Sequence, residues 1–572
     1  MDNVAIARIL REIADLLEIK DDNPFKIRAY RNGADIVSNH PHEFGRLSDV
    51  ELRQIPGIGK DLAARIREIA DTGDAAFHRD LIAEFPPTIL DLLHLQGVGP
   101  KTVATLYREL GVRTIDDLEA AAKDGRVRAL RGMGAKKESL ILKALEERKK
   151  FAGRHLLADA HEAASALAVY LQEHAPAATI EPVGSLRRGC DTCGDLDLLA
   201  CGAPASLMDA FIEYPKVARV LGHGDTKSSI LLEGGMQADL RLVDAQSRGA
   251  ALQYFTGSKA HNIALRDRAI GLGLKLNEYG VFRVEGDVRI AGDSEEDVYA
   301  ALGLDWVSPE LREMRGEVEA AAAHALPRLV DRGDLRGDLH MHTTETDGKD
   351  DIRTMALAAR DAGLEYIAIT DHSQALSMAN GLDEHRALAH AERIRAVDRE
   401  DLGIRLLAGI ECDIRSDGSL DLADDCLAAL DLVIVSVHSG FNQDRQQMTD
   451  RIVRAIEHPH VDIVGHPTGR RLLQREPYAV DVDAVVSAAV RRGVALEINC
   501  QVSRLDLNDV YAKMARDHGA RLVISTDAHA RTAFGRLRWG VLVARRAWLT
   551  PADVLNTQPF DTLRASLRRN RR

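Results

Sequence analysis

The sequence predicts a multidomain α/β protein with a helical N-terminal region, an α+β middle region and a C-terminal barrel of parallel strands. Three observations support this fold class. Glycine pairs recur between helical segments in the first 150 residues, an acidic strand follows, and apolar runs end at histidine or carboxylate residues from about residue 335 onward. A chain of 572 residues is too long for one hydrophobic core, so we expect several domains.

The composition is that of soluble globular domains, because 45% of the residues are apolar and 28% are charged. No apolar run approaches the roughly 20 residues of a membrane-spanning helix. The first helix interleaves charged residues with Val4, Ile6 and Ile9, so it does not read as a signal peptide. Six cysteines in so long a chain indicate no disulfide framework, and we expect a cytoplasmic location. The net charge of −13 does not exclude nucleic acid, because metal-binding carboxylates contribute to it.

Three segments of the N-terminal region share one pattern, two glycines separated by one residue between helical stretches. The helix after each pair begins with free backbone N–H groups, which favour a phosphate at the positive end of the helix dipole. A lysine near each pair adds electrostatic attraction. The predicted phosphate contacts are Gly57, Gly59 and Lys60, then Gly97, Gly99 and Lys101, and finally Gly132, Gly134 and Lys136.

A structural interpretation of this pattern is that each glycine pair only joins two packed helices. The spacings of about 40 and 35 residues also fit a helical solenoid. However, the intervening segments share no repeat, and the recurrent lysines favour phosphate binding. The pattern resembles the helix-hairpin-helix motif, which binds DNA backbones without reading the base sequence.

The middle region places two acidic residues on one predicted strand. Asp195 and Asp197 alternate with leucines, so both carboxylates project from the same face. Asp239 lies in a second apolar run, 237–243, which we expect in the same sheet. Three carboxylates and the phosphates of a substrate suit two Mg²⁺ ions, which take few protein ligands.

A phosphate-binding turn is predicted just before this acidic strand. Gly184 and Ser185 open a short helix, and Arg188 follows, so this turn could hold a triphosphate. Cys190 and Cys193 have the spacing of half a zinc or redox site. Because no second cysteine or histidine pair lies at a matching distance, we interpret that spacing as coincidental.

These residues, with further motifs between 254 and 279, resemble nucleotidyltransferases, specifically family X DNA polymerases similar to DNA polymerase beta. The resemblance covers about residues 1–315. It implies that Asp195 and Asp197 hold both ions, while Asp239 binds the catalytic ion and helps to activate the primer 3′-OH. The implied nucleotide contacts are Gly184, Ser185, Arg188 and Gly194 at the triphosphate, Tyr254, Phe255 and Gly257 at the sugar, and Asn262 and Arg266 at the minor-groove side of the new pair.

Two residues depart from the family pattern. Cys193 stands where DNA polymerase beta has a serine near the triphosphate, and a thiol is a weaker donor. Arg65 stands where that enzyme has its Schiff-base lysine, and a guanidinium that stays protonated cannot act as an amine nucleophile. We therefore expect no efficient 5′-deoxyribose-phosphate lyase activity.

From about residue 335, apolar runs that read as buried strands end at residues able to bind a metal ion. Strands that alternate with helices predict a parallel barrel, whose reactive groups gather at the C-terminal strand ends. Their side chains would therefore converge. The candidate ligands are six histidines and three carboxylates, namely His340, His342, Asp347, His372, Glu411, His438, His466, Asp527 and His529.

One zinc ion needs only three or four ligands, so nine ligands argue for two or three ions that share bridging carboxylates. A lone histidine at a strand end is more often a hydrogen-bonded residue than a ligand. The recurrence over the whole set favours a catalytic cluster. Four histidines lack this placement and are interpreted as ordinary surface residues, namely His385, His390, His458 and His460.

The nine positions resemble the trinuclear site of the PHP (polymerase and histidinol phosphatase) family, over about residues 335–572. The resemblance implies a (β/α)7 barrel that hydrolyses phosphate esters, with Glu411 and His438 among its catalytic residues. Divalent ions suit that reaction because they lower the pKa of water and balance charge in the transition state. We expect three ions at this site, Zn²⁺ or Mn²⁺, and Mg²⁺ or Mn²⁺ at the acidic site of the middle region.

The whole chain is similar to bacterial family X polymerases that carry a C-terminal PHP domain. The expected domains are an N-terminal helical domain (1–80), a fingers-like helical DNA-binding region (81–150), a nucleotidyltransferase palm (151–250), a thumb-like nascent-pair domain (251–315), a helical linker (316–335) and a PHP phosphoesterase domain (336–572).

The implied function is DNA repair by gap-filling DNA polymerisation and metal-dependent 3′-5′ exonuclease activity, with AP endonuclease or 3′-phosphatase activity as additional options. Gapped or nicked duplex DNA and deoxynucleoside triphosphates would be its partners. Two alternatives stay open. The polymerase half could be only a gap-binding module, against which the intact acidic triad argues. The barrel could instead act on small phosphate monoesters, against which the DNA-binding hairpins argue.

Overall fold

The protein is described by a computed structural model that covers residues 3–20, 22–39, 44–85, 87–95, 98–130, 132–135, 137–139, 141–142, 145, 153–376 and 379–567. The chain divides into two compact units. Unit 1 comprises Met1–Gly153 with Glu233–Gly235, and unit 2 comprises Arg154–Leu232 with Met236–Arg572. Within the described residues, no helix has both the length and the apolar character needed to span a membrane.

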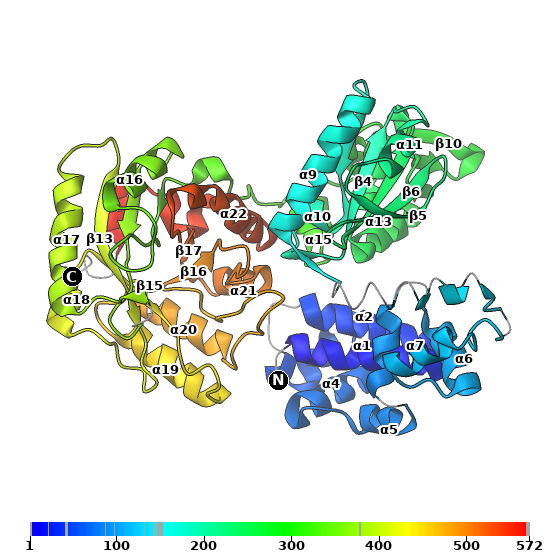
Figure 1. Cartoon of the computed structure of the whole chain (residues 1–572), viewed down its shortest axis with the longest axis horizontal. Coiled ribbons are helices and arrows are strands. Elements are labelled where there is room, and N and C mark those ends of the chain that lie inside the picture. The colour runs from blue at the N-terminus through cyan, green and yellow to red at the C-terminus, as the bar shows by residue number, and fades with distance from the viewer. Residues whose placement is uncertain are drawn as a thin grey trace. The chain divides into compact units, whose positions relative to one another are not determined.

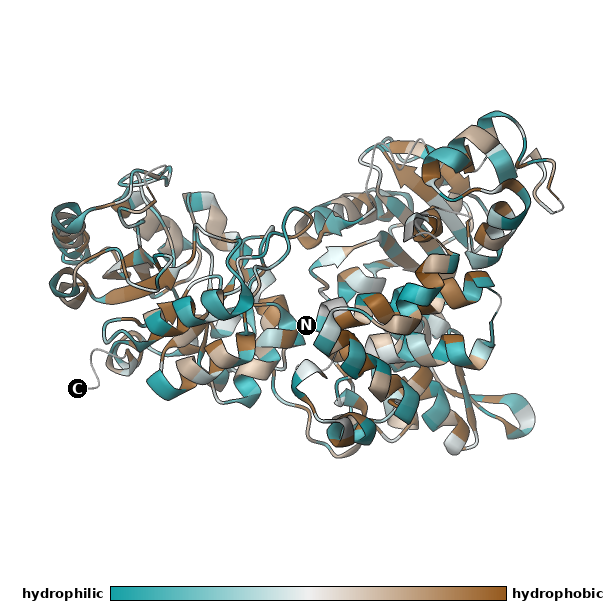
Figure 2. Ribbon diagram, turned by 90° about the horizontal axis from the view of Figure 1, so that it is seen from below, coloured by the Kyte–Doolittle hydropathy of each residue, from teal (hydrophilic) through white to brown (hydrophobic). Residues whose placement is uncertain are grey.

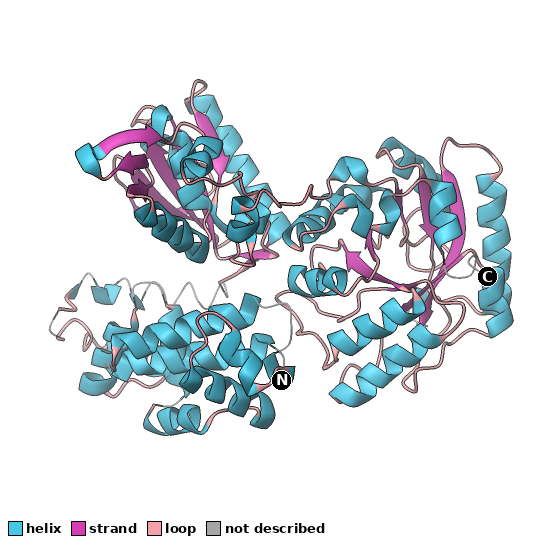
Figure 3. Cartoon of the chain, turned by 180° about the vertical axis from the view of Figure 1, so that it is seen from behind, coloured by secondary structure: helices cyan, strands magenta, loops and turns pink. Residues whose placement is uncertain are grey.

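Unit 1 consists of helices and loops in its described part (Figure 3). The first helix shows why, because Ile6, Leu10, Ile13 and Leu17 recur every three or four residues and are fully buried. They pack with apolar residues of the other helices into one core. The helices are Asn3–Lys20 (α1), Pro24–Asn39 (α2), Asp49–Gln54 (α3), Lys60–Thr72 (α4), Ala76–Glu84 (α5), Pro100–Leu110 (α6) and Ile115–Lys123 (α7), with 3₁₀ turns at Phe44–Arg46 (η1) and Pro87–His94 (η2).

Unit 2 begins with a five-stranded mixed sheet in the order β2-β4-β7-β6-β5. The central strands β4 and β7 are parallel, and the other pairs in this sheet are antiparallel. Its elements are His155–Leu156 (β1), Leu157–His174 (α9), Thr179–Pro182 (β2), Gly184–Arg187 (α10), Thr192–Cys193 (β3), Asp195–Cys201 (β4), Leu207–Ile212 (α11), Val217–Gly222 (β5), Lys227–Leu232 (β6) and Gln237–Val243 (β7).

A smaller antiparallel sheet, β10-β9-β8, follows this one with helices beside it. Its core includes Leu265, Val281 and Val298, all fully buried. The elements are Arg248–Thr256 (α12), Lys259–Gly271 (α13), Leu274–Asn277 (β8), Gly280–Arg283 (β9), Val288–Ala291 (β10), Glu295–Ala301 (α14) and Glu317–Ala322 (α15), with 3₁₀ turns at Ala245–Ser247 (η3), Glu285–Asp287 (η4), Pro309–Leu311 (η5) and Arg332–Asp334 (η6).

Seven parallel strands form the C-terminal barrel in chain order, from β11 to β17, and helices surround them (Figure 1). Past the ends of β11 and β17, Met341 pairs with Ala528, and the N–H of His342 donates to the carbonyl of Ala528 at 2.8 Å. This pairing joins the first strand to the last. The strands are Gly337–Asp338 (β11), Tyr366–Ile369 (β12), Arg405–Asp413 (β13), Leu432–Ser436 (β14), Ile463–Val464 (β15), Ala495–Asn499 (β16) and Leu522–Ser525 (β17).

The alternation of the strands explains the two apolar layers of the barrel. On β12, Tyr366 and Ala368 belong to the inner cluster, whereas Ile367 and Ile369 belong to the larger cluster that includes the helices. Hydrophilic residues lie along the outward faces of the helices (Figure 2). These helices are Ile352–Asp361 (α16), Glu384–Asp398 (α17), Asp424–Ala429 (α18), Arg445–Glu457 (α19), Val482–Arg492 (α20), Asp509–Asp517 (α21), Leu537–Arg546 (α22) and Phe560–Ser566 (α23), with 3₁₀ turns at Arg531–Arg536 (η8), Pro551–Asp553 (η9) and Leu555–Thr557 (η10).

The predicted fold class is therefore confirmed. The N-terminal region is helical, the middle region combines helices with a mixed sheet, and the C-terminal region is a seven-stranded parallel barrel.

Candidate metal centres and nucleic-acid contacts

The nine predicted barrel ligands lie together at the C-terminal ends of the strands and in the loop after β11. Among the residues that the structure describes, three groups have ligand atoms within 4.8 Å of one another. These groups are His342, Asp347, His372 and His529; His340, His342 and Asp527; and His372, Glu411 and His438. His466 joins them through its Nε2, 3.0 Å from Glu411 Oε1.

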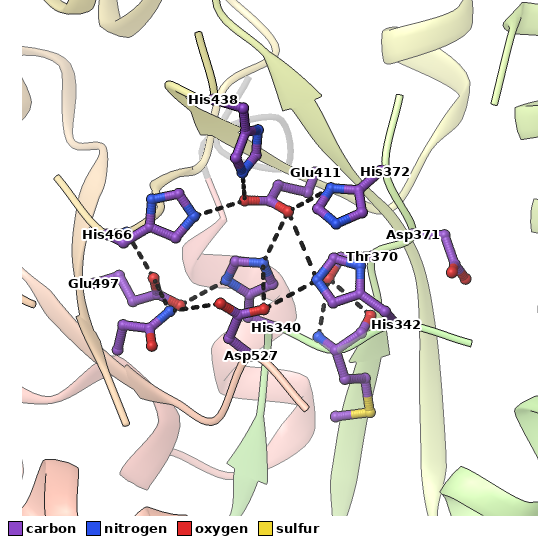
Figure 4. A network of polar contacts seen from close by, with 12 residues as sticks. His340, His342, Thr370, Asp371, His372, Glu411, His438, His466, Glu497 and Asp527 are labelled. Atoms are coloured by element: carbon purple, nitrogen blue, oxygen red, sulfur yellow. Dashed lines mark hydrogen bonds and ion pairs between the residues drawn. The ribbon is translucent and has the colours of Figure 1, made fainter. Parts of the chain in front are cut away.

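Glu411 lies at the middle of this cluster (Figure 4). Its Oε2 is 2.9 Å from His372 Nδ1, 3.4 Å from His340 Nε2 and 3.6 Å from His342 Nε2. Its Oε1 faces His438 Nε2 at 3.4 Å. One buried carboxylate thus touches several imidazoles from different strands, as expected of a residue that bridges metal ions.

Five side-chain atoms of these ligand residues are buried without a hydrogen-bond partner in the described part of the chain. Buried polar atoms are nearly always hydrogen-bonded, so such a convergence needs a further partner. Imidazole nitrogens and carboxylate oxygens at one point suit a divalent metal ion. The five atoms are Nε2 of His340, Nδ1 of His342, Nδ1 of His372, Nδ1 of His466 and Oε2 of Glu411.

The protonation states of two ligands fit the same use. Burial, followed by the charges of His372 and His529, lowers the pKa of His342 to about 4. Burial, followed by the charge of Arg504, lowers the pKa of His466 to about 3. Both rings are therefore neutral near pH 7, and each keeps a lone pair that can bind a metal ion.

Two carboxylates behind the ligands orient their rings. Glu497 on β16 lies 2.7 Å from Nδ1 of His340 and also accepts the backbone N–H of His466. Asp413 lies 2.6 Å from Nδ1 of His438. Such partners fix the ring tautomer and its direction. Neither residue was predicted from the sequence, although Glu497 is an acidic residue between Leu496 and Ile498 of a buried strand, which is an unusual position.

The interpretation of His390 as a surface histidine is wrong. Its side chain is buried, and Nε2 lies 2.8 Å from Oδ2 of Asp371. Asp371 also accepts the backbone N–H and the hydroxyl of Thr343, so this pair holds the loop after β11. The error arose because the burial of one face of α17 depends on the barrel and not on local sequence. His385 is exposed, and His458 and His460 are half-buried.

The three acidic residues of the middle region lie on the adjacent strands β4 and β7. Asp197 is directly opposite Asp239 in the parallel register, and Asp195 is two residues before Asp197 on the same face. Burial, followed by the charges of Asp195 and Asp239, raises the pKa of Asp197 to about 6. The ammonium of Lys227 lies 2.8 Å from Asp239 Oδ2. The charges of Asp195 and Asp239 disfavour ionisation of Asp197, and a divalent cation would offset that repulsion.

The predicted phosphate-binding turn begins directly against these acids. Gly184 has a φ of +63°, and a Cβ there would lie 2.4 Å from Oδ2 of Asp197. Only glycine fits both conditions. Ser185 follows it in α10, and Gly194 comes directly before β4. The turn and the strand that carries Asp197 are therefore in direct contact.

The predicted sugar and base contacts lie at the junction of α12 and α13. The amide of Asn262 donates to the carbonyl of Tyr254 at 2.6 Å, and Arg266 Nε reaches the carbonyl of Asn262 at 3.4 Å. Phe255 and Gly257 lie on either side of Thr256, whose carbonyl accepts from Arg188 at 2.5 Å. Arg188 of the predicted phosphate-binding turn therefore contacts the segment that carries the predicted sugar contacts.

A barrel helix reaches this same turn. Arg546 of α22 donates to the carbonyl of Arg188 at 2.9 Å and to Glu313 Oε1 at 2.9 Å. Glu313 also accepts from Nε of Arg188 at 3.0 Å. On its other side, Arg546 Nε donates to Asp509 at 3.0 Å. The mixed sheet and the barrel thus share one buried polar network.

In unit 1, the glycine pairs share one backbone geometry. The residue between the glycines, Ile58, Val98 or Met133, is buried, and its N–H donates to the carbonyl three residues earlier. Gly59 and Gly99 cap α4 and α6 without a side-chain hydrogen bond. No capping side chain therefore occupies the free N–H groups at the start of α4 and α6, where α6 begins with Pro100, which has no N–H itself.

The remaining residues of the glycine-pair motifs are the other glycines and the lysines. Gly57 and Gly132 have φ values of +90° and +81°, and Gly134 has open space around it. Lys60 and Lys101 are exposed. Gly97 and Lys136 lie outside the described residues.

Comparison with protein families assigns four segments of the chain. Residues 1–75 match the helix-hairpin-helix domain, and residues 89–147 match the SAM-like helix-hairpin-helix tandem. Residues 251–313 match the DNA polymerase beta thumb, and residues 338–501 match the PHP domain.

Among curated proteins, the chain is similar over its whole length to the DNA polymerase/3′-5′ exonuclease PolX of Bacillus subtilis (strain 168). The two are 38% identical over 569 residues, 99% of each chain. Part of the chain is also 32% identical to a probable phosphatase of Shewanella sediminis, over 39% of this chain and 89% of that protein. A probable phosphatase of Thermoanaerobacter sp. (strain X514) is 31% identical over 38% of this chain and 89% of its own length.

Proposed function

The chain belongs to the family of the DNA polymerase/3′-5′ exonuclease PolX, and we propose that it fills short gaps in DNA and degrades DNA from 3′ ends in repair. The single observation that carries the proposal is that one chain holds two separate sets of candidate metal ligands. Carboxylates of β4 and β7 form one, and histidines and carboxylates at the barrel strand ends form the other. We propose base excision or break repair as its setting, because both proposed activities act on DNA 3′ ends.

In the first centre, we assign Asp195 and Asp197 to two ions, Mg²⁺ or Mn²⁺, and Asp239 to the catalytic ion. These ions neutralise the triphosphate and favour attack by the primer 3′-OH. Around them, the protein's own part is positioning and charge. The turn at Gly184 brings the triphosphate against Asp197, because any larger residue would strike that carboxylate. The nucleotide contacts assigned are Ser185, Arg188, Gly194, Tyr254, Phe255, Gly257, Asn262 and Arg266.

In the second centre, we assign the nine barrel ligands to three divalent ions, Zn²⁺ or Mn²⁺. These ions activate water and neutralise the phosphate being cleaved. We assign Glu411 and His438 to contacts with the reacting groups. Glu497 and Asp413 hold His340 and His438 in one orientation, so the site is rigid before DNA arrives.

The proposed DNA contacts are nonspecific. The uncapped N-termini of α4 and α6, with Lys60 and Lys101 exposed beside them, suit phosphate groups of the backbone. Gapped or nicked duplexes and deoxynucleoside triphosphates are the proposed substrates. Because Arg65 is a guanidinium and not an amine, lyase activity on 5′-deoxyribose phosphate is not expected.

The decisive experiment uses Asp195→Ala and His342→Ala separately on a duplex with a one-nucleotide gap and a labelled 3′ end. We expect the first variant to abolish nucleotide incorporation and to keep degradation, and the second to do the reverse. Loss of both activities in either variant contradicts two independent centres. If the unmodified protein incorporates no nucleotide with either Mg²⁺ or Mn²⁺, the polymerase half is only a gap-binding module.

A second candidate function is hydrolysis of small phosphate monoesters by the barrel. It is favoured by the similarity of part of this chain to proteins described as probable phosphatases. Comparing rates on p-nitrophenyl phosphate and on a 3′-recessed duplex separates the two functions. Rates of 3′-phosphate removal and of cleavage at an abasic site, measured in parallel, test the additional activities.

A further inference from the structure

We propose that Arg471, Arg475 and Arg504, here called the rim arginines, bind a second phosphate group of a DNA strand whose neighbouring phosphate is cleaved at the barrel metal centre. This inference rests on the proposed exonuclease function and names its specificity site. The ligand is a polynucleotide strand, because a small monoester offers no second phosphate.

Two loops at the ligand end of the barrel carry these residues. The loop after β15 contains Arg471 and Arg475, and the loop after β16 contains Arg504. Backbone hydrogen bonds tie the loops together, from Leu472 N–H to the Ser503 carbonyl at 2.7 Å, while the Arg470 side chain donates to the carbonyl of Arg504 at 2.8 Å. Hydrogen bonds between the two loops therefore hold the backbone that carries the rim arginines.

Their charge is not neutralised within the described residues. None of the three arginines has a carboxylate oxygen within ion-pair distance there, and the buried Nε of Arg504 has no hydrogen-bond partner. The contacts of the other two are neutral: Arg471 with the Ser503 hydroxyl at 3.5 Å, and Arg475 with the carbonyl of Gly469 at 2.7 Å and the ring of Phe441 at 4.1 Å.

Nearby carboxylates are already engaged. Asp506 is in range of Arg504 but accepts the N–H and hydroxyl of Thr468, and Asp527 is in range of Arg471 but is an assigned metal ligand. The charge of Arg504 also acts on Arg471, Arg475 and His466. Three guanidinium groups beside a site for cations repel one another, and an anion would relieve that repulsion. Guanidinium groups match phosphate oxygens in both geometry and charge.

The test compares a one-phosphate diester with a longer strand. Thymidine 5′-monophosphate p-nitrophenyl ester reaches the metal centre alone, whereas a single-stranded oligothymidylate also reaches the rim. We expect Arg504→Ala and Arg471→Ala each to raise KM about 10-fold for the oligonucleotide. Hydrolysis of the ester should stay within about twofold. The salt dependence of the oligonucleotide KM should weaken by about 0.7 in log–log slope per lost contact.

Arg492→Ala is the matched control, because Arg492 is an exposed arginine at the end of α20, which leads into the opposite end of the barrel strands. Equal losses on both substrates, or no change on the oligonucleotide, would overturn the inference. If the unmodified protein hydrolyses the ester but degrades no DNA, the proposed exonuclease function fails instead. A phosphorothioate oligothymidylate, used as inhibitor of ester hydrolysis, still tests the rim, because its inhibition constant should rise about 10-fold in Arg504→Ala.

A separate observation carries a second inference: we infer that Arg546, a barrel residue, positions Arg188 for the triphosphate. This rests on the proposed polymerase function. Arg546 is buried and holds Arg188 twice, directly at its carbonyl and through Glu313 at its guanidinium. Asp509 fixes Arg546 from the barrel side, and Arg315 donates to the same carboxylate at 2.9 Å. The nucleotide site is thus completed from a domain more than 300 residues further along the chain.

Arg546→Ala should raise KM for deoxynucleoside triphosphates about 10-fold while kcat changes less than threefold, and Arg546→Lys should restore part of the loss. Arg545→Ala is the control, because Arg545 lies in the same helix and pairs with Glu310 at 2.6 Å without contacting Arg188. An equal KM change in the control, or a change in kcat alone, would refute positioning. If the unmodified protein incorporates no nucleotide, the polymerase function fails, and the affinity for Mg²⁺-bound triphosphate, measured by calorimetry, still tests this contact.

Discussion

The two candidate centres differ in the kinds of ligand they contain and in how the charges of those ligands are balanced. In the barrel, imidazoles outnumber carboxylates, the ligands come from many strands, and Glu411 and Asp527 are buried among histidines. In the mixed sheet, three carboxylates come from two neighbouring strands, Asp195 is exposed, and a lysine pairs with Asp239.

This difference predicts how each centre binds its ions. The barrel set offers neutral rings and buried carboxylates in fixed positions, so it can bind ions without DNA. The acidic set offers few ligands near solvent, so substrate phosphates must supply the rest of the coordination shell. Stable ions are therefore expected in the barrel, and exchangeable ions in the sheet.

Metal removal is expected to give the largest difference between the two centres and is therefore the strongest test of this comparison. After treatment with a chelator and dialysis, Mg²⁺ alone should restore nucleotide incorporation fully. Degradation should stay at least about 100-fold below its starting rate until Mn²⁺ or Zn²⁺ is added, because imidazole ligands favour transition metals. Initial rates of both reactions on one gapped substrate measure this. Equal recovery of both activities with Mg²⁺ would show that the centres do not differ.

Next in size is the substitution Gly184→Ala. The added methyl would lie 2.4 Å from Oδ2 of Asp197 at a backbone φ that disfavours alanine. We expect kcat/KM for incorporation to fall about 100-fold and degradation to stay unchanged. Gly222→Ala serves as control, because nothing lies within 4 Å of its Cβ position. Retained incorporation in Gly184→Ala would mean that the turn is not part of the first centre.

A smaller effect is expected for Glu497→Gln, which weakens the support of His340. Loss of such a partner lowers metal affinity about 10- to 100-fold. Calorimetric titration of Mn²⁺ into the chelated protein measures it, and incorporation should be unaffected. Glu392→Gln, at an exposed position of helix α17, is the control. Unchanged Mn²⁺ affinity in Glu497→Gln would show that the barrel site is not organised by this layer.

The smallest effect on activity is expected for a change at Glu295, near the first centre, that alters the stability of the folded protein in acid. Glu295 is buried and pairs with Arg187 and Arg312. Burial opposes its charge, but these arginines lower its pKa from 4.5 to about 2. Because the folded-state pKa is depressed, its stabilisation is present above about pH 4.5 and is lost as pH falls toward 2. A shift of that size corresponds to about 3 kcal/mol.

Glu295→Gln should therefore unfold more readily at pH 7 and show less further destabilisation between pH 4.5 and 2 than the unmodified protein. Denaturant unfolding at a series of pH values measures both. Parallel acid profiles for the two proteins would contradict the assigned pKa.

Much of the candidate site was predictable because its rules are local. A ligand at the end of a parallel strand faces its neighbours whatever the rest of the fold, so the barrel ligands could be named from apolar runs. Glu497 was not predicted because it lies inside an apolar run and its partner His340 is 157 residues away. His390 was misread because only the packed barrel decides which face of α17 is buried.

The order of residues alone determined the types of secondary structure, the candidate metal ligands and their grouping into two sets. These follow from periodicity and from the coordination chemistry of each side chain, which need no knowledge of distant contacts. Only the tertiary structure decided which charges support the two sets. Arg546 donates to Arg188 and Glu313, and the charge of Arg504 acts on Arg471, because hydrogen bonds and electrostatic interactions depend on distances that chain separation does not encode.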